Sequence, residues 1–237
     1  MSANMSAAVV SALTLAAGSA SGALLDFEEF ANGEQVFASM GVTISDGGVG
    51  PGLGPAAFDS TPGGPNAGGS DTDLLVGLGN VLIVQNDAFS AQTTPGTFDE
   101  PNDEEGGGQI DFDFASPQQM LSIDMVDINS NGPAWVRLFD SQGESRVYFV
   151  PLNWTFDVLS QPMGWDTLDL TSTSPQLGEG GTSTTVTETS GFDPLDVVRL
   201  EVEFDGSAGL DNLSFIPAPG TVAMLGGLAL IARRRRA

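Results

Sequence analysis

The chain has 237 residues, of which 31 are acidic and seven basic, and it contains no cysteine and no histidine. These absences exclude disulfide bonds, thiolate nucleophiles, Ser-His-Asp triads and zinc sites built from Cys or His. A bound metal would have to take oxygen ligands, as Ca²⁺ and Mg²⁺ do. With 31 acids and three arginines, residues 24–216 carry a formal charge of −28. This part should repel nucleic acid and attract divalent cations, or its charge simply keeps an exported protein soluble.

The first 23 residues have the pattern of a secretory signal. They contain no charged side chain, and small apolar residues run from Ala7 to Ala17. Small residues at Ser21, Gly22 and Ala23 suit a cleavage site. We therefore expect residues 1–23 to form a signal helix that exports the protein; the alternative is an Ala-rich first helix of the fold.

Residues 24–216 are predicted to form one acidic all-β domain. Apolar and polar residues alternate in many short segments, as in residues 110–114, 121–125 and 198–204, and this pattern is typical of strands with one buried face. Further expected strands are residues 24–30, 36–44, 80–85, 135–139, 146–150, 166–170, 184–188 and 209–215. Two sheets of this kind packed face to face give an antiparallel β-sandwich, for which we expect a jelly-roll-like arrangement.

Two long segments lack this alternation. Residues 46–73 contain nine glycines and four prolines, and residues 93–108 are acidic and rich in glycine. Loops of this length are usually functional or disordered.

The C-terminal segment, residues 217–237, has a short Pro-Ala-Pro-Gly motif, an apolar run and an Arg cluster. The motif is Pro217, Ala218, Pro219 and Gly220, and the cluster is Arg233, Arg234, Arg235 and Arg236. The apolar run between them, 222–232, would span only about 17 Å as a helix, against ~30 Å of membrane hydrocarbon. We therefore expect a short apolar helix that serves as a sorting signal; a plain single-span tail anchor is the alternative.

This tail resembles the PEP-CTERM sorting signal of Gram-negative bacteria that make exopolysaccharide, with alanine in place of the usual glutamate. The resemblance covers about 21 residues. It implies recognition by an exosortase-type membrane enzyme, transient or tail-mediated association with the inner membrane, and a final location at the cell surface or outside the cell.

One carboxylate should point into the core. In the last strand, Asp211 shares a face with Leu213 and Phe215, and a buried carboxylate is costly unless it is paired or bound to a cation. First and last strands often lie side by side in jelly rolls, so Asp26 and Glu28 of the first strand should converge with Asp211. A second candidate cation site combines Asp59 with Asp71 and Asp73 in the Gly-rich loop, where ordinary turn residues are the alternative.

The body also resembles galactose-binding-like jelly rolls of carbohydrate modules, in its segments DFEEF, GNVLIVQND and GLDNLSF. The resemblance implies a structural Ca²⁺ that ties the first strand to the last. It also implies a glycan site on exposed aromatic side chains, for which Trp154 and Trp165 are the candidates.

These observations favour a non-catalytic, calcium-stabilised surface or matrix protein. The alternatives are a carbohydrate-binding protein and, less favoured because no catalytic constellation is defined, a glycan-acting hydrolase.

Overall fold

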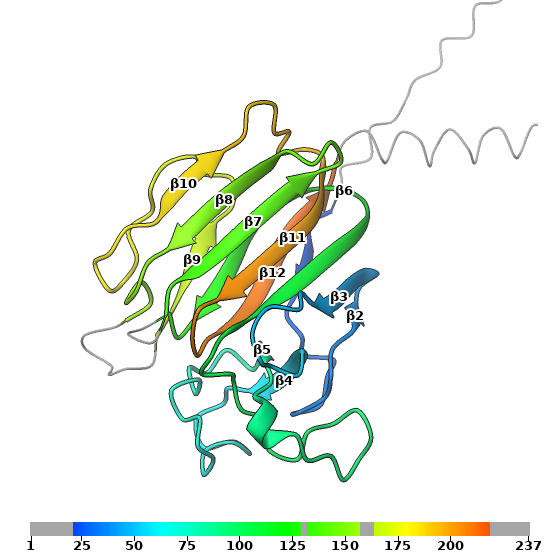
Figure 1. Ribbon diagram of the computed structural model, residues 1–237, viewed down its shortest axis with the longest axis vertical. Helices are drawn as coiled ribbons and strands as arrows, with labels where there is room; N and C mark the ends of the chain where they lie inside the picture. Colours follow the sequence, from blue (N-terminus) through cyan, green and yellow to red (C-terminus); the bar gives the residue numbers. More distant parts are fainter. Residues whose placement is uncertain (1–20, 129–131, 157–163, 219–237) are drawn as a thin grey trace, which may run out of the picture.

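The computed structural model describes residues 21–128, 132–156 and 164–218 (Figure 1). Regular structure in these residues is antiparallel β-strand apart from one short 3₁₀ helix, which confirms the predicted all-β class. The elements in chain order are β1 (Ala23–Leu25), β2 (Ala38–Ser39), β3 (Val42–Asp46), β4 (Pro55–Asp59), β5 (Asn80–Val84), η1 (Asp87–Phe89), β6 (Gly108–Val126), β7 (Ala134–Asp140), β8 (Ser145–Val150), β9 (Trp165–Asp169), β10 (Thr185–Glu188), β11 (Val197–Phe204) and β12 (Gly209–Pro217).

The 19-residue strand β6 connects two sets of strands. Its first half pairs with β3 and β11, and Phe114 lies opposite Val42. Its second half pairs with β12 and β9, and Ile123 lies opposite Leu168. Between the halves lies Pro117, which lacks the N–H that a strand needs to continue a hydrogen-bond ladder. The two predicted strands at 110–114 and 121–125 are therefore parts of one long strand that passes from one set to the other.

The first set runs in the order β10-β8-β7-β11-β6-β3, and β2 pairs with β3 at its end. Figure 1 shows β10, β8, β7 and β11 as one slanted row. The second set runs from β9 through β6, β12 and β5 to β4, and β1 lies beside β12. Within β7 and β8, buried residues alternate strictly with partly exposed ones. The first set therefore turns one face inward toward the second set, and the arrangement is sandwich-like.

The apolar faces of both sets share one core. Phe112, Leu138 and Leu200 of the first set belong to the same buried cluster as Ile123 and Leu213 of the second. A smaller cluster lies below the sheets around β4 and β5, with Phe58 and Phe98 among its members. Leu74 and Phe98 of this cluster belong to the two long loops, so the cluster attaches both loops to β4 and β5.

The structure differs from the sequence prediction in three segments. The predicted strand 24–30 ends at Leu25, because Phe27 has a left-handed backbone (φ 55°). The predicted strand 36–44 is instead the hairpin β2–β3, which turns at Met40 and Gly41 with φ of 49° and 81°. Strand β4 lies inside the irregular segment 46–73; its residues from Pro55 to Phe58 are buried on both faces, so no alternation marks it.

Candidate functional site

The pairing of the first and last strands places Asp211 beside residues that follow β1. Leu25 of β1 lies opposite Leu213 of β12, so Asp26 and the residues after it continue toward Asp211. On the other side of β12, Asp211 lies directly opposite Asp124 of β6. The sequence predicted that the first and last strands would be neighbours, and the structure confirms it. We call Asp26, Glu28, Asp124, Asp211 and Asn212 the Asp211 corner.

Backbone irregularity opens β12 at this corner. Asn212 has φ of 49°, and the β12–β6 register shifts between Asp211 and Ser214. The Asn212 amide Nδ2 donates to Asp211 Oδ2 at 3.0 Å and to Asp124 Oδ2 at 2.9 Å. Thr167 Oγ1 donates to Asp124 Oδ1 at 2.6 Å. One asparagine therefore bridges two carboxylates that face each other across the strands.

Asp211 is the least satisfied member of the corner. The residue is 1 % exposed, and its Oδ1 atom is buried without a hydrogen-bond partner. Burial raises the pKa of Asp211 to about 8, and the negative charges of Asp124, Glu28 and Asp26 also raise it. Glu28 is itself held in place, because the backbone N–H of Asn80 donates to its Oε1 at 2.8 Å. The corner therefore contains a buried Asp211 oxygen that accepts no hydrogen bond, and the neighbouring carboxylates place this oxygen in a negative potential.

Such a corner suits an oxygen-seeking cation. Within residues 21–128, 132–156 and 164–218, no three His, Cys, Asp or Glu side chains form a ready-made metal-binding group. A cation at Asp211 would therefore need backbone carbonyl oxygens and water beside the carboxylates. Ca²⁺ accepts such a mixed and irregular shell, whereas Mg²⁺ demands a near-ideal octahedron.

The second candidate site, at Asp59, Asp71 and Asp73, is divided by the structure. Asp59 Oδ1 accepts from the backbone N–H of Thr61 at 2.9 Å, which is the turn role given above as the alternative. Asp71 points elsewhere, because its Oδ2 accepts from the backbone N–H of Asp103 at 2.9 Å. Asp73 remains close enough to Asp71 to raise that residue's pKa. Among the described residues, the three carboxylates do not form a ready-made metal-binding group.

Asp71 forms a buried pair with Asp103, a residue that the sequence pattern did not indicate. Ser207 Oγ donates to Asp103 Oδ2 at 2.5 Å, so the pair joins the loop after β4, the loop after η1 and the β11–β12 turn. Burial raises the pKa of Asp71 to about 10, and the charge of Asp103 adds to this. Burial also raises the pKa of Asp103 to about 7. The acidic, Gly-rich composition of residues 93–108 was the one available signal.

The two candidate tryptophans do not form an exposed platform. Trp154 is 1 % exposed and belongs to the core, and its indole Nε1 donates to the backbone oxygen of Gln176 at 3.4 Å. Trp165, at the start of β9, is 37 % exposed. The expected glycan site on this pair is therefore wrong, because the core takes the larger apolar area of Trp154 out of water.

The predicted end signals lie mostly outside the described residues. Residues 1–20, Pro219, Gly220 and the arginines at 233–236 are not among them. Pro217 ends β12, and the backbone N–H of Ala218 donates to the oxygen of Pro117 at 3.1 Å. Ala23, the last residue of the predicted signal, is the first residue of β1. Among the described residues no helix is long and apolar enough to cross a membrane.

Comparison with known proteins assigns neither a family nor a function to the chain. No protein-family model matches the chain, and a search of curated proteins finds no match.

Proposed function

We propose that this chain is an exported, non-catalytic protein of the cell surface or extracellular matrix, whose jelly-roll-like body is stabilised by Ca²⁺ at the Asp211 corner. The N-terminal pattern of residues 1–23 supports export. The Pro-Ala-Pro tail at 217–237 supports sorting by an exosortase-type enzyme, with transient association with the inner membrane. An extracellular polysaccharide is the natural surrounding of such a protein.

The observation that carries the calcium proposal is the buried Oδ1 atom of Asp211, which has no hydrogen-bond partner. A carboxylate in this position is costly when charged, and the nearby carboxylates increase the cost. A divalent cation would satisfy the free oxygen and neutralise its neighbours. It would also link β1, β12 and β6, which are far apart in the sequence.

Thermal unfolding of the full chain tests the proposal. With Ca²⁺ at ~100 times its Kd, one native site should add about 2.7 kcal/mol, or about 5–10 °C in Tm for a chain of this size. Mg²⁺ at the same concentration should add much less. The Asp211→Asn variant should lose the rise, and Asp113→Asn, on the partly exposed face of β6, should retain it.

Two results would contradict the proposal. One is a Tm that Ca²⁺ and chelator leave unchanged in the unmodified chain. The other is an equal rise in Asp211→Asn, which would show that Ca²⁺ acts on the general negative charge and not on this corner.

The sorting proposal needs a separate measurement in the native cell. Deletion of residues 217–237 should leave the body exported but change where it is retained. Fractionation of cells and medium would show this, and an unchanged distribution would remove the support for a sorting tail.

A further inference from the structure

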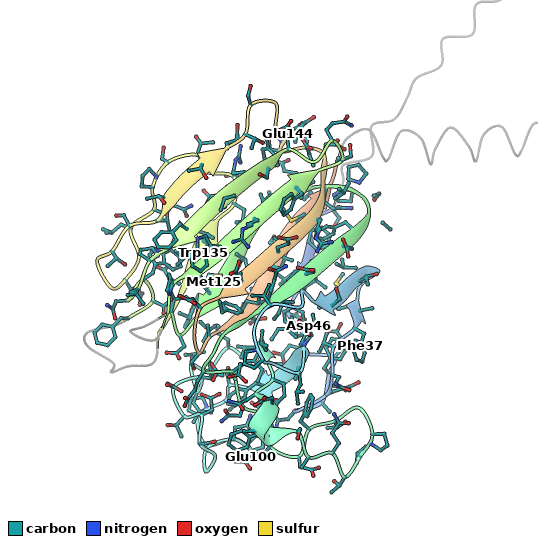
Figure 2. All side chains as sticks on the ribbon, in the orientation of Figure 1. Phe37, Asp46, Glu100, Met125, Trp135 and Glu144 are labelled. Atoms are coloured by element: carbon teal, nitrogen blue, oxygen red, sulfur yellow. The ribbon has the colours of Figure 1, made fainter. Side chains whose placement is uncertain are left out.

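The two long irregular segments of the sequence form ordered walls around a cavity. The loop between β4 and β5 supplies one wall, and the loop between η1 and β6 supplies the other. The cavity has a volume of about 470 Å³, within the range of small-molecule sites (about 300–1,000 Å³). The polar side chains in its lining are those of Asn32, Asn66, Asp71, Asp99 and Glu100. Figure 2 shows Glu100 at the end of the molecule away from Glu144, below the sheets.

Two amides in this lining are fixed in position. Asn32 Nδ2 donates to Asn66 Oδ1 at 2.9 Å, and Asn66 Nδ2 donates to Asn32 Oδ1 at 2.8 Å. The backbone of Asp59 holds both of them, because its N–H donates to Asn32 Oδ1 at 2.9 Å and its oxygen accepts from Asn66 Nδ2 at 3.0 Å. Asn66 is 8 % exposed. After these bonds, Asn32 Nδ2 retains one hydrogen to donate and Asn66 Oδ1 retains one lone pair, so the cavity keeps a donor and an acceptor in place.

The charge of the lining restricts the ligand. Asp99 and Glu100 contribute acidic side chains, whereas Asp71, whose raised pKa keeps it protonated at neutral pH, adds no charge. No arginine is among the lining residues. Hydrogen bonds from Thr93 to Asp99 lower the pKa of Asp99, so this carboxyl group stays ionised at neutral pH. Phosphates, uronates and other anions would be repelled, whereas a cationic group would be attracted.

The remaining lining is apolar. Pro65 supplies exposed carbon surface, whereas Phe58 is fully buried in the second core cluster and supports the cavity from beneath. A ligand that fits all three parts of the lining has hydroxyl groups for the amides, a carbon ring face for the apolar residues and a positive charge for the carboxylates.

We propose that this cavity binds an amine-bearing sugar unit, such as a glucosamine residue of a polysaccharide. Its hydroxyl groups would bond to Asn32 and Asn66, and its ammonium group would face Asp99 and Glu100. The site is separate from the Asp211 corner and does not depend on a cation there.

Isothermal titration of the full chain with glucosamine, glucose and glucuronate tests this proposal, at a pH at which the amine is protonated. Glucosamine should bind saturably and about tenfold more tightly than glucose, because a hydrogen bond to a charged group contributes more than a neutral one. Glucuronate should not bind. Equal binding of glucosamine and glucuronate, or saturable binding of none of the three, would overturn the proposal.

Two variants locate the site. A side chain at Gly68 would meet no atom within 4 Å at its Cβ, so Gly68→Phe should fold and place its ring over the cavity. It should abolish glucosamine binding without lowering Tm. Asp99→Asn can still accept from Thr93 but lacks the charge, so its affinity for glucosamine should fall toward that for glucose while Glu100 retains part of the difference.

The charge-matched control is Asp113→Asn on β6, which should bind as the unmodified chain does. If Gly68→Phe bound glucosamine as tightly as the unmodified chain, the ligand would lie outside the cavity and the proposal would fail.

Discussion

At the residue scale, the charge of Asp211 can be neutralised by a proton or by a cation. The pH dependence of the free energy of unfolding distinguishes these two cases. The folded-state pKa of Asp211, about 8, lies above the ordinary value of 3.8. The folded state therefore holds a proton that the unfolded chain has already lost. The stability that this proton gives is complete below pH ~4 and is lost as the pH rises toward 8.

In chelator, the free energy of unfolding should therefore fall with rising pH between about 4 and 8. Asp211 contributes about 1.4 kcal/mol per pH unit to this slope, and Asp211→Asn should remove that contribution. Urea denaturation at several pH values measures the difference. Asp71 and Asp103, whose pKa values are also raised, should leave a slope of the same sign in the variant. Identical slopes in both proteins would show that Asp211 does not retain a proton.

The sequence could predict Asp211 but not Asp103, for a physical reason. Asp211 lies in an alternating strand, and a period of two shows which face it occupies. Asp103 lies in a loop, and its hydrogen bond to Ser207 spans 104 positions of the chain. Only the folded course of the loop brings them together. Trp154 likewise lies in a turn segment outside the named strands, so no period indicated that it would be buried.

At the element scale, β1 is short, but it pairs with the last strand, β12, and contributes Leu25 to the core. Its three residues pair with β12 from Leu213 to Phe215. Leu25 is 1 % exposed, whereas its neighbour Leu24 is 45 % exposed. The two leucines therefore offer a matched pair with the same side chain, the same strand and opposite burial.

We expect Leu25→Ala to lower the free energy of unfolding by about 2–5 kcal/mol, through lost apolar burial and the cavity it leaves. Leu24→Ala should change it by less than about 0.5 kcal/mol. Urea denaturation of both variants measures the contrast. Similar losses would mean that β1 does not hold its place in the second set of strands.

The same scale shows how far strand prediction reached. Strands with one solvent-exposed face, such as β7, β8 and β11, were predicted nearly to their ends because buried and partly exposed residues alternate along them. Strand β4 was missed because Pro55, Ala56 and Ala57 give neither alternation nor the run of large apolar residues that indicated β5, which is also buried on both faces. The course of β6 was only half predicted, since each half alternates but nothing local shows that Pro117 lies within one continuous strand.

At the scale of the whole molecule, negative charge opposes folding. Residues 24–216 carry a charge of −28, and the ion pairs among the described residues involve Arg137, Arg146 and Arg199. Most carboxylates therefore repel one another, and this repulsion is screened by salt, with a Debye length of about 30 Å at 0.01 M and about 8 Å at 0.15 M.

In chelator, Tm should rise when NaCl is increased from about 0.01 M to 0.15 M and beyond. Differential scanning calorimetry measures the rise, and Asp211→Asn should show it as fully as the unmodified chain. An equal rise in both proteins would show that NaCl acts by screening the overall negative charge and not by placing a cation at the Asp211 corner. A Tm that fell with added NaCl would mean that attractive pairs outweigh the net repulsion.

The adjacency of β1 and β12 also determines how the body would respond to force. A pull that drew the two ends of the described chain apart would act on neighbouring positions, because Ala23 lies opposite Phe215. It would peel β1 away one residue pair at a time. A load applied through residue 218 alone would instead enter β12, which is bonded to β6 along one side and to β1 and β5 along the other. The bonds on both sides would then share that load, so the strand that leads into the C-terminal tail is braced along both edges against tension.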